Sequence, residues 1–82
     1  MTHAISYTEF STQQLEKRIM TTWMQGRLLG SVKGKKISCY LYQLPNFYVE
    51  LIFSQDKNKV LNTYPFKDEL TLSKYLHNIN ID

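Results

Sequence analysis

The chain has 82 residues, of which 43% are hydrophobic, 13% aromatic and 21% charged, and its formal net charge is +3. These values fit one folded domain over residues 1–82 and exclude an intrinsically disordered chain, because disorder requires few apolar residues and a high net charge. A single cysteine excludes an intramolecular disulfide, and we expect a cytoplasmic protein without membrane association, because we find neither a signal-peptide pattern nor an apolar run of the ~20 residues that a membrane span needs.

A helix is predicted near the N-terminus, after a loose tail at residues 1–7. Ser11 and Gln14 have the spacing of a capping box, and Gly26 is a typical helix stop, so the helix is expected over residues 12–25. Its apolar side chains recur at helical spacing: Leu15, Ile19 and Trp23, widened by Met20 and Met24. We interpret this stripe as the side of the helix that packs into the core.

Four strands are predicted after this helix, because β-branched and aromatic residues are dense and turn residues interrupt them at short intervals. The expected strands are residues 27–32, 36–44, 47–54 and 59–64. The expected turns are Lys33-Gly34, with glycine tolerating positive φ, then Pro45-Asn46, then residues 55–58. Short strands joined by such tight turns indicate an antiparallel meander.

The last strand is expected to end at Pro65, which cannot donate to the ladder. A C-terminal helix follows, with one apolar face made of Leu72, Tyr75, Leu76 and Ile79. The predicted fold class is therefore α+β: a helix, a four-stranded antiparallel meander sheet and a C-terminal helix.

A two-residue turn at Pro45-Asn46 would fix which side chains share a face of the sheet. The first face then carries Tyr40, Tyr42, Leu44, Phe47, Val49, Leu51 and Phe53, extended by Leu29, Val60 and Tyr64. The second carries Ile37, Cys39, Leu41, Tyr48, Glu50 and Ile52, extended by Leu28, Val32 and Leu61. We expect both helices on the first face, which has more aromatic area and no central charge. The alternative is one helix on each face.

The second face would then remain open, and an exposed apolar patch of that size usually marks an interface. This favours a small non-enzymatic protein-interaction module, acting as a homodimer or binding another protein through Leu41, Glu50 and Ile52. Charging Leu41 or Ile52 should then give a folded monomer.

Five lysines lie at the first and third turns, which a meander places at the same end of the sheet: Lys33, Lys35, Lys36, Lys57 and Lys59. Such a cluster can contact phosphates, so a nucleic-acid-binding module is the alternative function, with tyrosines as stacking groups. Lysines are also common on exposed turns, where they raise solubility and keep edge strands from pairing with another chain. We favour this interpretation of the five lysines.

No catalytic, metal or cofactor site can be assembled from the sequence. Cys39 lies among apolar strand residues, and neither His3 nor His77 is placed near it, so a small buried side chain is the favoured interpretation. One cysteine and two distant histidines do not make metal-ligand spacing. The glycines do not form a phosphate-binding loop. We therefore expect a protein that is not an enzyme and uses no cofactor.

The second half of the chain resembles small bacterial proteins of unknown function. The resemblance is carried by Leu41-Tyr42, by Phe47-Tyr48-Val49-Glu50, by Phe66, and by Leu72 with Tyr75-Leu76. It implies a compact α+β domain and brings no catalytic residues with it.

Overall fold

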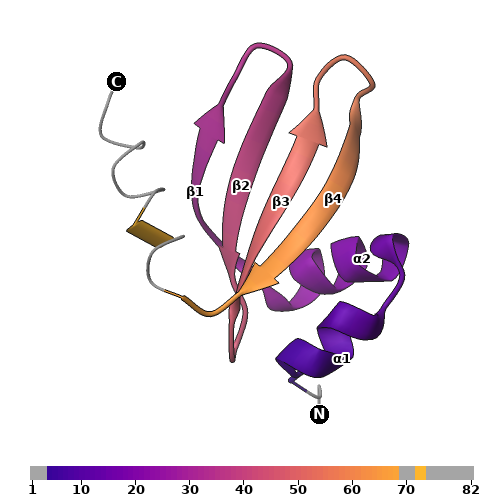
Figure 1. Ribbon diagram of the computed structural model, residues 1–82, viewed down its shortest axis with the longest axis vertical. Helices are drawn as coiled ribbons and strands as arrows, with labels where there is room; N and C mark the ends of the chain where they lie inside the picture. The colour runs from indigo at the N-terminus through magenta and orange to yellow at the C-terminus, as the bar shows by residue number, and fades with distance from the viewer. Residues whose placement is uncertain (1–3, 69–71, 74–82) are drawn as a thin grey trace.

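The computed structural model describes residues 4–68 and 72–73 (Figure 1). Two helices, α1 (Tyr7–Thr12) and α2 (Leu15–Gln25), precede four strands: β1 (Arg27–Lys33), β2 (Ile37–Gln43), β3 (Tyr48–Ser54) and β4 (Lys59–Phe66). The strands form one antiparallel sheet in the order β1-β2-β3-β4. The predicted α+β class and the meander are confirmed. Most of the predicted C-terminal helix falls outside the described residues.

The N-terminal region forms two helices rather than one. Ser6 caps α1 in a capping box with Glu9, and the backbone is extended at Gln13 and Gln14, which separates α1 from α2. The predicted box at Ser11 is wrong, because Ser11 lies inside α1 and its hydroxyl donates to the carbonyl oxygen of Tyr7. A capping box needs only a hydroxyl and a Glu or Gln three residues later, and both Ser6 with Glu9 and Ser11 with Gln14 have this spacing.

The predicted loose tail is also shorter than expected. Ile5 is buried, and its backbone N–H donates to Oε1 of Gln25 at the end of α2 over 3.1 Å. Phe10 of α1 is fully buried, and its ring centroid lies 5.3 Å from that of Phe47. These contacts fix α1 against the end of the sheet that carries the β2–β3 turn.

The register of the sheet follows from its turns. Pro45-Asn46 forms the predicted two-residue connection, and the N–H of Leu44 donates to the carbonyl of Phe47 over 2.8 Å. The register pairs Tyr42 with Val49, as predicted. The turn at residues 55–58 is confirmed as well, and its Asn58 has a φ of 53°, a left-handed conformation that asparagine tolerates.

The predicted first turn at Lys33-Gly34 is wrong. Lys33 belongs to β1, and the N–H of Gly34 donates to the carbonyl of Ile37, which leaves Lys35 and Lys36 as the two connecting residues. No glycine with positive φ occurs in the described residues. Gly34 instead allows a close approach, because a Cβ there would lie 2.6 Å from the Ile37 carbonyl oxygen.

Pro65 does not end β4, which continues to Phe66. Pro65 pairs with Val49, and β4 is an edge strand, where proline is tolerated because its nitrogen can face away from the neighbouring strand.

The predicted division of the sheet into two faces holds for β2 and β3, and also for Val32 and Val60, which pair with Cys39 and Phe53. It fails for two other residues of the outer strands. Leu28 pairs with Tyr42 and so lies on the first face, while Tyr64 pairs with Glu50 and lies on the second. The register of β1 shifts after Leu28, and that of β4 shifts opposite Ile52 and Phe53. A bulge inserts one residue and reverses the faces beyond it.

Each face carries its own cluster of buried side chains. On the first face Leu44, Phe47 and Val49 pack with Ile5 and Phe10 from the N-terminal segment. On the second face, Leu41 and Phe66 form a cluster against which Leu72 packs. The N-terminal helices therefore lie on the first face as predicted, whereas Leu72 lies on the second. Among the described residues, no helix is long and apolar enough to cross a membrane.

Candidate functional site: an apolar groove beside the second helix

Helix α2 contacts the rest of the chain through its polar side. The guanidinium of Arg18 donates from Nε to Oγ1 of Thr63 over 2.8 Å and from Nη2 to Oδ1 of Asn62 over 2.9 Å, both on β4. Its Nη1 donates to the carbonyl oxygen of Gln13 over 2.7 Å, in the segment between the helices. One turn further along, Thr22 is fully buried. Arg18 thus joins α2 to the edge strand and to the end of α1.

The apolar stripe of α2 is consequently left outside the buried core. Met20, Trp23 and Met24 are 55%, 57% and 76% exposed, and Leu15 and Ile19 are only half-buried. The interpretation of this stripe as the core-packing side of the helix is wrong. On an α-helix, residues 18 and 22 lie on one side and residues 19 and 23 on a neighbouring one, so docking through Arg18 and Thr22 leaves the apolar stripe open.

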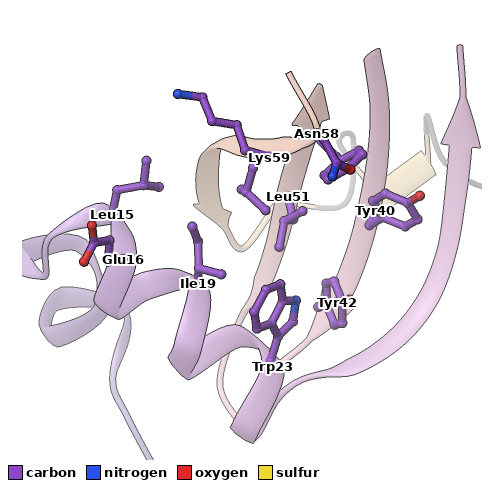
Figure 2. A pocket seen from close by; sticks show the side chains of 11 residues that line it. Leu15, Glu16, Ile19, Trp23, Tyr40, Tyr42, Leu51, Asn58 and Lys59 are labelled. Carbon is purple, nitrogen blue, oxygen red and sulfur yellow. The ribbon is translucent and has the colours of Figure 1, made fainter. Parts of the chain in front are cut away.

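This stripe borders a groove of about 700 Å³ between α2 and the first face of the sheet. Figure 2 shows Ile19 and Trp23 on the helix side and Tyr40, Tyr42 and Leu51 on the sheet side. The groove is also lined by Leu15, Glu16, Phe53, Asn58, Lys59 and Val60. The helices cover the first face near the β2–β3 turn and leave it open toward the other end, where this groove lies (Figure 1).

Two residues of opposite charge line the groove. Glu16 comes from α2 and Lys59 from the start of β4, and both side chains are exposed. Within the described residues, neither side chain has an ion-pair partner. The site is therefore an aromatic and aliphatic recess with one acid and one base beside it. Such a surface suits a partner that is apolar at its centre and carries both charges at its rim.

The predicted partner-binding residues on the second face differ in exposure. Leu41 is 2% exposed and belongs to the cluster with Phe66 and Leu72, so it is packed within the chain. Glu50 and Ile52 are half-buried, and both lie on that face because they pair with Leu41 and Cys39 respectively. A role for Glu50 and Ile52 in partner binding stays a prediction.

The five lysines predicted to lie together are at one end of the sheet. The turns at Lys35-Lys36 and at residues 55–58 are joined by a hydrogen bond from the N–H of Gln55 to the carbonyl of Lys36, over 2.8 Å. Lys33, Lys35, Lys36, Lys57 and Lys59 are all exposed. Figure 1 shows both turns at the end of the sheet opposite α1. Lys59 connects this end to the groove, because it also lines the groove.

Cys39 is half-buried against the second-face cluster and is not in a disulfide. His3 and His77 lie outside the described residues. In the part of the chain that the structure describes, histidine, cysteine, aspartate and glutamate side chains do not gather in a group of three that could hold a metal ion.

Comparison with family models, with curated proteins and with solved structures finds no match to this chain. The site is therefore interpreted from its own geometry, and the resemblance to small bacterial proteins stays a prediction.

The residues that sequence reasoning missed are Trp23, Met20 and the open part of the first face. A signal for them exists in the sequence. Arg18, Thr22 and Gln25 recur at helical spacing on α2 and form a second, polar stripe beside the apolar one. A helix with two such stripes can pack against the rest of the chain through either one. Here the hydrogen-bond acceptors on β4 select the polar stripe.

Proposed function

We propose that this protein is a non-enzymatic protein-interaction module that binds an apolar partner in the groove between α2 and the first face of the sheet. The observation that carries the proposal is the docking of α2 through Arg18 and Thr22, which leaves Trp23 exposed in the wall of an apolar recess and Met20 exposed one turn before it on the helix. The groove replaces the second face as the favoured surface, because Leu41 is buried there.

The hydrophobic effect supports a covered state for this groove. Trp23 is 57% exposed, which leaves on the order of 140 Å² open if a large aromatic side chain presents about 250 Å². Covering that area is worth roughly 3.5 kcal/mol at about 25 cal/mol per Å². Met20 and the half-buried groove walls add to this driving force. Contiguous exposed apolar surface of this kind marks interaction sites in proteins that function in water.

The test is photo-crosslinking in the source cells, with a photoreactive amino acid in place of Met20. The matched control places the same group at Tyr64, which is 51% exposed and lies on the second face. We expect defined adducts with protein from position 20 and weak, diffuse labelling from position 64. Equal labelling at both positions, or defined adducts from position 64 alone, would contradict the proposal.

A second candidate function is binding of a polyanion such as single-stranded nucleic acid, and one observation favours it. The Gln55–Lys36 hydrogen bond holds the two lysine-rich turns together, and Lys59 adjoins a groove lined by aromatic rings. Lysines along a backbone path with aromatic stacking groups beside them are typical of single-strand binding. Here Tyr40 and Trp23 would offer the rings and the lysines the charge.

This candidate is tested by the salt dependence of binding to a fluorescent oligothymidylate. Binding through several lysines should weaken steeply as salt rises, with a slope set by the number of phosphates contacted. Replacing Lys35 and Lys36 with glutamine should lower affinity and flatten that slope, whereas Lys17→Gln, an exposed lysine of α2, should change neither. Binding that is lost equally with Lys17→Gln would refute the candidate.

A further inference from the structure

We infer that the occupant of the groove is a second copy of this chain, docked about a two-fold axis so that the α2 ridge of each copy enters the groove of the other. The ridge consists of Met20 and Trp23 and the groove is the recess described above. This inference rests on the proposed function and names the partner of the same site.

The shape of the surface favours a second copy. A two-fold interface uses the same patch on both partners, so the patch must contain both a projection and a recess that receives it. Here the two features adjoin on a single helix: Ile19 lines the recess, and Met20, more than half exposed, stands next to it. Trp23 belongs to both, because it lines the groove and is 57% exposed. A flat patch or an isolated pocket would not meet this condition.

The placement of charge around the groove also favours a second copy. Glu16 stands on the helix side of the groove and Lys59 on the sheet side. When the helix of one copy enters the groove of the other, its Glu16 approaches the sheet side of that copy, which carries Lys59. The two-fold axis generates a second contact, in which Lys59 of the first copy approaches Glu16 of the other. One acid and one base in each chain therefore give two contacts between opposite charges. A surface of a single sign would repel a second copy.

The size of the exposed apolar surface sets the strength of such a dimer. A stable interface buries about 800 Å² on each partner. Met20, Trp23 and Leu28 are each more than half exposed, and together leave roughly 300 Å² open if large side chains present about 150–250 Å² each. Leu28 lies on the same face, paired with Tyr42 in the groove wall. These side chains supply less than half of the area that a standard interface buries, so a dimer through this patch belongs to the small, weakly associating class and should form only as concentration rises.

The decisive experiment uses purified protein and exchanges the two charges. Sedimentation equilibrium should give a dimer for the unaltered chain. Glu16→Lys alone places two bases in contact and Lys59→Glu alone places two acids in contact, so each should raise the dissociation constant at least tenfold. An equimolar mixture of the two variants should restore dimerisation, because every cross-contact is again between opposite charges. Recovery on mixing is specific to self-association through this pair.

Matched truncations locate the interface independently of charge. Trp23→Ala should raise the dissociation constant at least tenfold, while Tyr64→Ala, which removes a similarly exposed aromatic ring from the second face, should leave it unchanged. Circular dichroism should show that both variants keep the fold of the unaltered chain.

Three results would overturn the inference: a monomer at all concentrations, a dimer sensitive to Tyr64→Ala and not to Trp23→Ala, or no recovery when the charge variants are mixed. A monomer that still forms a defined crosslink from position 20 in cells to a different protein would overturn the second copy as occupant and leave the proposed function standing. A monomer without such a crosslink would remove both.

Discussion

Replacing Arg18 with methionine tests how α2 is attached to the rest of the chain. Methionine keeps much of the length of the side chain and its helix propensity, and it removes three hydrogen bonds: to Thr63, to Asn62 and to the carbonyl of Gln13. A typical intramolecular hydrogen bond contributes about 1 kcal/mol net and one to a charged group about 1.5–3 kcal/mol. Because Arg18 is only half-buried, we take the lower figure and expect a loss of ~3 kcal/mol.

The assay is urea unfolding followed by circular dichroism at a fixed protein concentration, because self-association would otherwise shift the midpoint. With an m-value near 1.5 kcal/mol/M, a loss of ~3 kcal/mol lowers the midpoint by about 2 M. Lys17→Met is the matched control: Lys17 is the adjacent residue of α2 and is exposed, so its replacement should change the free energy of unfolding by less than about 0.5 kcal/mol. Equal midpoints for Arg18→Met and Lys17→Met would refute the docking of α2 through its polar side.

Three further variants test the fold around the site, each by the same urea assay. Ser6→Ala removes the hydroxyl that caps α1 and should lower the free energy of unfolding by about 1 kcal/mol; no change would mean that the box does not hold α1. Gly26→Ala places a Cβ 2.4 Å from the carbonyl oxygen of Thr22 and should lower it by about 1–3 kcal/mol; a gain would mean that α2 continues past this residue. Phe10→Ala empties a fully buried position and should lower it by about 3–5 kcal/mol, whereas Met24→Ala, at 76% exposure, should change it little; equal effects would refute the assigned core.

The sheet was largely predictable because its central pairing depends on local residues. Pro45-Asn46 permits a two-residue connection, and once that turn is placed, alternation assigns every side chain of β2 and β3 to a face. The outer strands were less predictable. Gly30, inside the first strand, is a sign of a bulge, but it does not fix on which side of the glycine the register shifts. That shift moved Leu28 to the first face and so placed another apolar side chain beside the candidate site.

The orientation of α2 was not predictable from periodicity, because an apolar stripe on a helix normally faces the core. The deciding contacts join residues distant in the sequence: Arg18 bonds to Asn62 and Thr63, more than 40 positions later. A pattern confined to residues 15–25 contains no information about acceptors on β4. The candidate site therefore emerged only when the helix and the edge strand were placed together.

The positions of the hydrogen-bond acceptors around Arg18 also explain why α2 can pack through its polar side. Arg18 offers a planar group with several N–H donors in fixed directions, and its three acceptors come from β4 and from the segment between the helices. Buried or half-buried polar groups stabilise a fold when they are satisfied, and the described residues contain no buried side-chain nitrogen or oxygen without a hydrogen-bond partner. The polar docking of α2 is therefore compatible with a stable fold.

The most direct test of the account is acrylamide quenching of tryptophan fluorescence as a function of protein concentration. Trp23 is the only tryptophan in the chain, so the signal reports this one position. The account predicts strong quenching in dilute protein, where the groove is open, and weaker quenching as concentration rises and a second copy covers the ring. A tryptophan that stays shielded from acrylamide at concentrations where sedimentation equilibrium gives a monomer would contradict it, because the apolar stripe of α2 would then face the core of its own chain.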